Sequence, residues 1–307
     1  MPCAWLRKKT SKTNSSYAGT PRSLWPRRSG TEKDMGSILY TAPNCIRCKI
    51  VKDFLAEKEQ EYSAVDFKGD AETFNKFYRT HRKAIYRNPE GVEFPLFQDG
   101  NVIRQGSGEI LAYLLSGHAL EVCVTRSDML HGKISGLYPS QCPDGQEENF
   151  QTLVRRLAEG GLQVWLQTDG RKPELLEKLL HIRDTRVLCN TVGGPEATAE
   201  IFGGAPSAEE LAATIRLVRD TPDGAVRFLV MPLPDGNGWS WPRREDAAAA
   251  AKMVAAACGQ PTLPYTIVPV TPEMPWDTRG LKPLPDENLL MYRSAARQHL
   301  FKAEIAR

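Results

Sequence analysis

The chain lacks the long hydrophobic runs of a membrane protein and the dense cysteines of a small secreted domain. No apolar stretch approaches the roughly 18 residues that a membrane-spanning helix needs, so we expect no membrane association. Its seven cysteines are scattered over 307 residues, unlike the regular framework of a disulfide-rich domain. This sparse usage favours a reducing compartment, and we expect a cytoplasmic protein of about two domains.

Acidic residues are scarce at the N-terminus. Residues 1–34 carry two acids against eight lysines and arginines, a balance of +6, which leaves −3 of the net +3 charge for the rest of the chain. The segment is rich in Ser, Thr and Pro without apolar periodicity, which predicts a disordered tail over residues 1–35. Three interpretations stay open: a start of translation at Met35, a genuine basic tail, or an organelle-targeting segment. The tail by itself does not indicate nucleic-acid binding.

A regular pattern begins at Ser37 and predicts the element order βαβαββα within about 80 residues. Asp99-Gly100, between two apolar runs, is the signal for the hairpin in this order. The order is that of a thioredoxin-type domain, which we place over residues 36–118. The predicted elements are a strand at 37–40, a helix at 45–59, a strand at 61–67, a helix at 70–82, a hairpin at 93–106 and a helix at 107–117.

Two cysteines, Cys45 and Cys48, open the first predicted helix. A sulfur at a helix N-terminus faces unpaired N–H groups and the positive end of the helix dipole, which favour the thiolate. Arg47 and Lys49 add positive charge to the same turn. We therefore predict that Cys45 attacks a disulfide and that Cys48, one turn later, resolves the mixed disulfide.

Other uses of this cysteine pair stay open. A metal site held by the chain alone needs more ligands, yet the five histidines form no helix-spaced pair and there is no second Cys-x-x-Cys. We therefore predict no metal ligands. A cluster shared between two subunits, and a pair of inert core cysteines, are the remaining alternatives.

Two motifs in this region resemble the glutaredoxins. "LYTAPNCIRC" matches the family's strand followed by Cys-x-x-Cys at a helix start, and "FPLF", about 50 residues later, stands at its cis-proline loop. Within the superfamily, the cysteine motif is most similar to the glutaredoxin-like hydrogen donors of ribonucleotide reductase. The resemblance implies a cis bond before Pro95, which exposes the backbone of Phe94 to an incoming peptide or glutathione.

The resemblance also implies a substrate surface around the cysteines. Thr41 stands near the place of the family's basic residue, Arg47 replaces the usual tyrosine between the cysteines, and Gly106-Ser107 corresponds to the loop that grips glutathione. Two plainer interpretations remain open. Pro95 could be an edge-strand proline, and Ser107 could simply be the N-cap of the last helix.

Residues 119–307 alternate apolar strands with longer helices, which predicts a parallel α/β domain, either an open sheet or part of a (β/α) barrel. Two pairs, Asp144 with Glu147 and Ser207 with Glu210, have the spacing of a capping box. The predicted strands are 133–140, 162–170, 185–194, 225–232 and 265–270, and the predicted helices are 146–159, 173–181, 207–219, 243–258 and one in the tail from about 286.

This second region resembles the radical S-adenosylmethionine enzymes, in particular the small activating enzymes of glycyl-radical proteins. "LAEGGLQVWLQTDGRKPELLEKLL" matches their strand with a Thr-(Asn/Asp)-Gly turn, and "VRFLVMP" and "PYTIVPV" match later strands. The family's three clustered cysteines are absent, since Cys123 and Cys142 are 19 residues apart, and Tyr138 stands where a glutamate is expected. We therefore expect a degenerate partial barrel without S-adenosylmethionine or a [4Fe-4S] cluster.

Several residues of the second region are candidates for other roles. Thr168, Asp169 and Gly170 end one strand, Asn190 and Gly193 lie past another, and Arg227 is in a third, so they are either ligand-binding residues or ordinary turn residues. Cys189, in an apolar run, is expected to be a core residue. The tail helix is expected to dock through Leu290, Ala295 and Leu300.

Together these patterns predict a thiol-disulfide oxidoreductase of glutaredoxin type. Its partner would be a protein disulfide, and the two resemblances together suggest anaerobic ribonucleotide reduction, with a ribonucleotide reductase as client and glutathione as a candidate cofactor. The second domain would dock the client. The rival prediction is a non-enzymatic adaptor or iron–sulfur cluster carrier, in which Cys45 and Cys48 bind rather than exchange.

Overall fold

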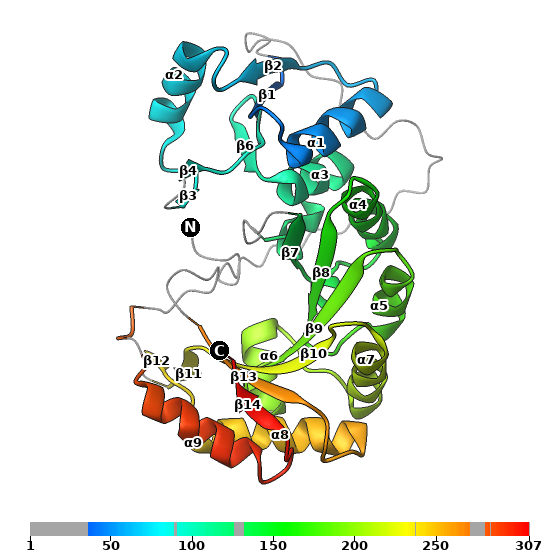
Figure 1. The fold of residues 1–307 in the computed structure, drawn as a ribbon, viewed down its shortest axis with the longest axis vertical. Coiled ribbons are helices and arrows are strands. Elements are labelled where there is room, and N and C mark those ends of the chain that lie inside the picture. Colours follow the sequence, from blue (N-terminus) through cyan, green and yellow to red (C-terminus); the bar gives the residue numbers. More distant parts are fainter. Residues whose placement is uncertain are drawn as a thin grey trace, which may run out of the picture.

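The computed structural model describes residues 36–88, 91–125, 132–236, 238–270, 280–282 and 284–306. The protein is α/β, with a four-stranded mixed sheet and a six-stranded parallel sheet, both accompanied by helices (Figure 1). Among the helices in these ranges, none has the length and apolar character required to cross a membrane. The tail predicted over residues 1–35 lies outside the described residues.

The four-stranded sheet is built from the first third of the chain, in the order β2-β1-β5-β6. β1 runs parallel to β2 and antiparallel to β5, which is antiparallel to β6. The short β3–β4 ladder before β5 was not predicted. The elements are β1 (Ile38–Thr41), α1 (Ile46–Glu57), β2 (Ser63–Asp66), α2 (Ala71–His81), β3 (Arg87–Asn88), β4 (Gly91–Val92), β5 (Leu96–Asp99), β6 (Val102–Gln105) and α3 (Ser107–Ser116).

The predicted hairpin is confirmed as β5 and β6. Asp99 pairs with Val102, so the loop consists of Gly100 and Asn101, one residue later than predicted. Gly100 has a φ of 57°, a value that glycine adopts without the steric cost of a side chain.

Both faces of this sheet are covered, because successive side chains of a strand point to opposite sides. Leu39 and Phe97 belong to the apolar cluster that contains the buried residues of α1 and α3. Tyr40 and Leu96, their immediate neighbours, belong to a second cluster with Phe74 and other α2 residues. The helix α1 is therefore fixed against the sheet by one face, and its N-terminus stands at the end of β1.

The six-stranded sheet has the order β14-β13-β10-β9-β8-β7, and every pair in it is parallel. The strands follow each other in chain order, with β7 and β14 as the two edges. The elements are η1 (Ala119–Val122), β7 (Lys133–Leu137), η2 (Pro139–Gln141), α4 (Glu147–Glu159), β8 (Gln163–Thr168), α5 (Pro173–Leu180), β9 (Thr185–Thr191), α6 (Pro195–Phe202), α7 (Ala208–Asp220), β10 (Ala225–Val230), β11 (Leu233–Asp235), β12 (Gly238–Ser240), α8 (Arg244–Cys258), β13 (Tyr265–Pro269), α9 (Asp286–Ala296) and β14 (Ala303–Ile305).

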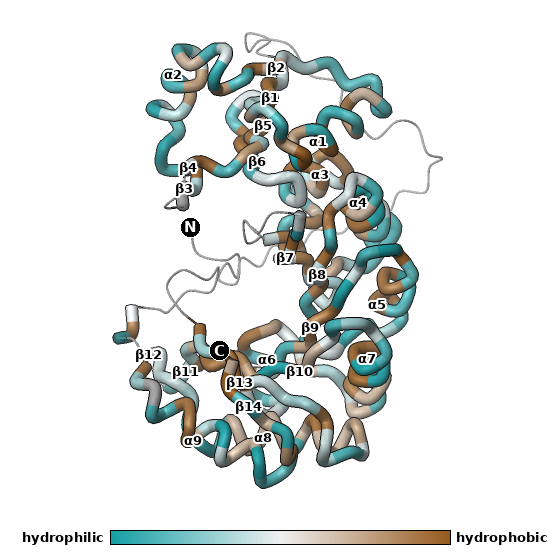
Figure 2. Tube along the Cα trace, in the orientation of Figure 1, coloured by the Kyte–Doolittle hydropathy of each residue, from teal (hydrophilic) through white to brown (hydrophobic). Residues whose placement is uncertain are grey.

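The helices that connect these strands pack through apolar stripes. Leu175 and Leu179 of α5 and Ile215 and Val218 of α7 are buried at the three- and four-residue spacing of a helix face. Figure 2 shows the hydrophobic residues of these helices on the side turned toward the strands. The predicted capping box of α7 is confirmed, whereas Asp144 does not cap α4: its N-cap is Gln146, and Asp144 pairs with Lys172.

Two elements of the second region differ from prediction. The helix α6 was missed, although it begins with a proline at N1 and ends at Gly203 in the left-handed conformation, the usual asymmetry of helix ends. The C-terminal segment is not helical throughout, because β14 follows α9 and pairs with β13. Of the predicted docking residues, Ala295 and Leu300 are fully buried, but Leu290 is 48% exposed.

The two sheets share one continuous apolar cluster, which includes Leu39 of β1 and Ala303 of β14. The helix α4 lies beside α1 and α3, between the two sheets (Figure 1). Directly after α4, a Cβ placed on Gly160 would lie 2.3 Å from the Cγ1 of Ile50 in α1. The backbone of the second region therefore approaches the cysteine-bearing helix more closely than any side chain would permit.

Candidate redox site

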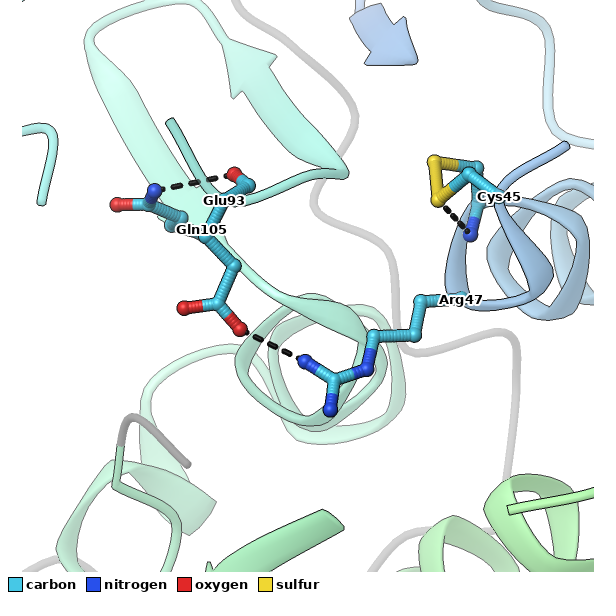
Figure 3. The surroundings of a disulfide bond; sticks show 5 residues. Cys45, Arg47, Glu93 and Gln105 are labelled. Atoms are coloured by element: carbon cyan, nitrogen blue, oxygen red, sulfur yellow. Dashed lines mark hydrogen bonds and ion pairs between the residues drawn. A yellow bond between two sulfur atoms is a disulfide. The ribbon is translucent and has the colours of Figure 1, made fainter. Parts of the chain in front are cut away.

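The site centres on Cys45 and Cys48, whose sulfurs form a disulfide with the two Cα atoms 5.2 Å apart. Cys45 is the N-cap residue of α1, and its Sγ accepts a hydrogen bond of 3.1 Å from the backbone N–H of Cys48 (Figure 3). Cys45 is half-buried, whereas Cys48 is 2% exposed. Of the two residues, Cys45 is thus the more accessible one.

The first turn of α1 contains no acidic residue. The free N–H groups and the positive end of the helix dipole therefore act on the Cys45 sulfur without a neighbouring carboxylate in that turn to oppose them. This arrangement favours a thiolate at Cys45 when the disulfide is reduced.

Arg47 does not contribute to that electrostatic effect as predicted. Its side chain is directed away from the disulfide, and its Nη1 lies 2.8 Å from Glu93 Oε1 (Figure 3). Its Nη2 donates to the carbonyl oxygen of Lys133 at 2.6 Å. Arg47 is only 8% exposed, and its charge is compensated by Glu93 rather than directed at the sulfur.

The second predicted cation is also paired. Lys49 Nζ lies 2.6 Å from Asp53 Oδ2, one turn further along α1, and both side chains are largely exposed. The sequence placed these two positive charges near Cys45 by their position in the chain, but each side chain finds a carboxylate elsewhere. The helix N-terminus is therefore the feature that remains next to the sulfur.

The Phe94–Pro95 peptide bond is cis, as predicted from the resemblance. Pro95 immediately precedes β5, which is paired on both sides, so the alternative of an edge-strand proline is wrong. The ring of Phe94 stacks on Phe67 at a centroid distance of 4.9 Å and packs in the α2 cluster. The ring of Phe94 is therefore held within that cluster, and the residue as a whole is half-buried.

The predicted glutathione loop is covered by other parts of the chain. Ser107 is 1% exposed, and the N–H of Gly106 donates to the carbonyl oxygen of Pro95 at 2.8 Å. A Cβ on the next residue, Gly108, would meet Ile134 and Val124 at 3.4 and 3.6 Å. The segments that lead into the second sheet thus pack over this helix start, which sequence alone could not reveal.

Two more predictions for the substrate surface are corrected by burial and capping. Thr41 ends β1 and is 3% exposed, with its carbonyl oxygen accepting from Phe67 N–H. Ser107 is not the N-cap of α3, since that position belongs to Gly106, which has no side chain that could cap the helix. Neither hydroxyl is available to a ligand in this conformation.

Sequence reasoning missed Glu93 and Gln105, two buried polar residues beside the cis peptide. Glu93 is 1% exposed and connects the proline loop to Arg47 on α1. Gln105 Nε2 donates to the carbonyl oxygens of Glu93 and Tyr86, and its Oε1 accepts from Tyr86 N–H. The only signal in the sequence was the acidic residue Glu93 directly before "FPLF", and nothing in the sequence indicated that Arg47 would be its partner.

The candidate ligand residues of the second sheet bind mainly one another. Arg227 Nη2 donates to Asn190 Oδ1 at 2.8 Å, and Asn190 Nδ2 donates to Gln167 Oε1 at 2.9 Å. Asp169 is buried and forms an ion pair of 2.6 Å with Arg171. Among the residues that the structure describes, no group of three or more His, Cys, Asp and Glu is arranged to hold a metal ion.

Cys189 is a core residue, as expected. It is fully buried on β9, and burial raises the pKa of its thiol to about 12. A thiol with such a pKa remains protonated at neutral pH and has little nucleophilic character.

No protein-family model matches the chain, and no curated protein matches it. The function is therefore inferred from the geometry of the site.

Proposed function

We propose that this protein is a thiol-disulfide oxidoreductase in which Cys45 attacks and Cys48 resolves. The observation that carries the proposal is the position of Cys45 as N-cap of α1, where its sulfur accepts the Cys48 N–H and no acidic residue shares the first turn. The more exposed of the two cysteines thus carries the sulfur that is better placed to exist as an anion, which is the form that attacks disulfides.

The exchange is balanced in two steps. The Cys45 thiolate attacks one sulfur of the client disulfide, the client S–S bond breaks, and the leaving client thiolate takes a proton from water. Cys48 then loses its proton and its sulfur attacks Cys45, which releases the second client thiol and leaves the Cys45–Cys48 disulfide. The client gains two electrons, and a reductant of the dithiol or glutathione class must return two electrons to this disulfide.

The segment around Pro95 supports a protein as the client. Arg47 and Glu93 tie this segment to the first turn of α1, and Phe94 within it is half-buried, so an extended client chain bound at Cys45 would lie beside it. Glutathione, by contrast, would have to bind without Ser107 and Thr41, which are buried. We therefore propose a protein disulfide as client and assign glutathione, if used, to the step that reduces Cys45–Cys48.

We further propose that the first region is a thioredoxin-like domain of glutaredoxin type and that the second is a degenerate partial (β/α) barrel. The strand order β2-β1-β5-β6 supports the first proposal, and the six parallel strands, which lie in the sheet in the order of the chain, support the second. The second region, packed against α1, would present the client. A client in anaerobic ribonucleotide reduction rests on resemblance alone.

Trapping of the mixed disulfide tests the proposal. In a Cys48→Ser variant the resolving thiol is absent, so we expect a model protein supplied with its disulfide intact to remain attached to reduced Cys45 as a mixed disulfide and to be released by dithiothreitol. The matched control is Cys48→Ser combined with Cys45→Ser, which should trap nothing. A single variant that accumulates no adduct, although it is folded and its Cys45 is reduced, would contradict the proposal.

Absorption spectroscopy separates this proposal from a cluster carrier or non-catalytic adaptor. A dithiol protein purified without oxygen is colourless, whereas an iron–sulfur cluster bound by Cys45 would give a brown protein whose colour is lost in Cys45→Ser. A brown protein without disulfide-exchange activity would favour the cluster carrier, and a colourless inactive one the adaptor.

A further inference from the structure

A second pair of thiols lies at the start of the six-stranded region. Cys123 and Cys142 are 19 residues apart in sequence, yet their side chains are within hydrogen-bonding reach of each other. Both belong to the shared apolar cluster, and they are 0% and 2% exposed. The other two described free cysteines, Cys189 on β9 and Cys258 at the end of α8, lie on different elements of the second region.

The backbone holds these two thiols together. Cys123 accepts a hydrogen bond of 2.9 Å at its carbonyl oxygen from Tyr138 N–H, and the next residue, Val124, forms an antiparallel bridge with Leu137. Cys142 lies four residues beyond Tyr138, after the single turn of η2. The pairing of the two segments therefore brings both cysteines to the same end of β7, where each Sγ–H donates to a nearby carbonyl oxygen, Cys123 to Leu120 at 3.3 Å and Cys142 to Pro143 at 3.7 Å. A disulfide requires the two sulfurs to leave these partners and reach about 2.05 Å.

The surroundings make the two sulfurs chemically unequal. The hydrogen bond with Cys123 and the positive charge of Lys172 lower the pKa of Cys142, whereas burial and the carboxylates of Glu147 and Asp144 oppose that effect. Lys172 is held there because its Nζ donates to the carbonyl oxygen of Cys142 at 2.6 Å. The pKa of Cys123 is raised by the same hydrogen bond and by burial.

We propose that Cys123 and Cys142 form a second redox site, which a small peroxide converts to an intramolecular disulfide. Hydrogen peroxide is the oxidant that suits the geometry, because a sulfur that is 2% exposed is closed to a protein or glutathione disulfide. This proposal is independent of the exchange reaction at Cys45, and either can fail without the other.

The reaction is balanced as follows. The Cys142 thiolate attacks one oxygen of hydrogen peroxide and the O–O bond breaks; the leaving hydroxide takes a proton to become water, and Cys142 becomes a sulfenic acid. The Cys123 thiol then loses its proton and attacks the Cys142 sulfur. The S–O bond breaks, a second water leaves, and the S–S bond forms. Two thiols lose two electrons in total, and one peroxide is reduced to two waters.

Peptide mapping of the oxidised protein is the test. The chain carrying Cys45→Ser and Cys48→Ser is treated with hydrogen peroxide, quenched with catalase, denatured, alkylated and digested. Trypsin cleavage after Lys133 separates the two cysteines, so a peptide pair that is linked before reduction and free after it identifies the bond. We expect this peptide pair, together with the loss of two alkylatable thiols. We also expect a rise in Tm of about 5 °C, because the cross-link restricts the conformations of the unfolded chain.

Controls make the result specific to this pair. Cys189→Ala in the same background removes another buried thiol and should leave the linked peptides and the Tm shift unchanged, whereas Cys123→Ser should abolish both. The same mapping on the wild-type chain needs no variant to fold. The proposal is overturned if Cys123 and Cys142 remain alkylatable after peroxide, or if Cys142 is found as sulfinic acid while Cys123 is still a thiol.

Discussion

The two cysteine pairs of this protein are assembled in different ways. Cys45 and Cys48 are three residues apart at the start of one helix, whereas Cys123 and Cys142 meet because two chain segments pair next to β7. The first pair includes a half-buried residue, Cys45, whereas both cysteines of the second pair are buried in the shared core. Proximity of thiols is therefore common to both, and the difference in accessibility is the reason why we propose protein disulfides as clients of the first pair and small oxidants for the second.

A similar contrast exists between two ion pairs on α1. Arg47–Glu93 and Lys49–Asp53 have nearly equal N–O distances of 2.8 and 2.6 Å, but the first is buried and the second exposed. Removing one partner of a buried pair leaves an uncompensated charge in a poorly solvated place, whereas water replaces the partner of an exposed pair. The same helix thus offers a matched test of what burial contributes.

The largest effect is expected from Cys45→Ser. Turnover of a protein disulfide should fall by at least about 1,000-fold, because a serine hydroxyl is a far weaker nucleophile than a thiolate. Cys142→Ser, measured in the same assay, should retain turnover close to that of the wild type. Equal losses of turnover in Cys45→Ser and Cys142→Ser would contradict the assignment of disulfide exchange to the Cys45–Cys48 pair alone.

Next in size is Arg47→Met. It leaves Glu93 buried without this partner and should lower the free energy of unfolding by about 3–5 kcal/mol. Lys49→Met, the exposed control two residues away, should cost at most about 0.5 kcal/mol. Urea titration of both variants measures the difference. Adding Glu93→Leu to Arg47→Met should recover part of the stability, and similar midpoints for the two single variants would contradict the assignment of the buried pair.

A smaller effect concerns the rates of alkylation by iodoacetamide in the reduced native protein. Cys45 should react about 100-fold faster than Cys142, since a buried thiol reacts only when the structure opens locally. Mass spectrometry of samples quenched at different times gives both rates from a single protein. If Cys142 is alkylated as fast as Cys45, the enclosed pair is open to larger reagents and the comparison fails.

The smallest effect is expected at the contact between α1 and the end of α4. Gly160→Ala would place a Cβ against Ile50 and should cost about 1–3 kcal/mol of unfolding free energy through overpacking. Gly194→Ala is the matched control, because its Cβ would meet Ala249 at an ordinary 3.5 Å and its φ of −71° suits any residue. Thermal unfolding of both variants compares them. Equal Tm values for the two variants would mean that the contact between Gly160 and Ile50 can widen without a loss of stability, which would contradict the prediction.

Prediction from the sequence succeeded where the signal was local. The Asp99-Gly100 hairpin, the Ser207–Glu210 capping box and the alternation of strands and helices after residue 132 all depend on a few neighbouring residues. It failed for β14, which is three residues long and is defined by its pairing with β13. It also failed for Leu290, since a helix pattern does not state which of its apolar residues the sheet will cover.

The sequence by itself determined that Cys45 begins a helix, because a helix start and its N-cap are set by residues within one turn. Only the tertiary structure decided what surrounds that sulfur. Arg47 found Glu93 and the Lys133 carbonyl oxygen, 46 and 86 residues away in the chain. Cys123 and Cys142 became neighbours through strand-like pairing, and Ser107 was covered by segments of the second region. Such contacts depend on how the whole chain closes around its shared core, which no local pattern encodes.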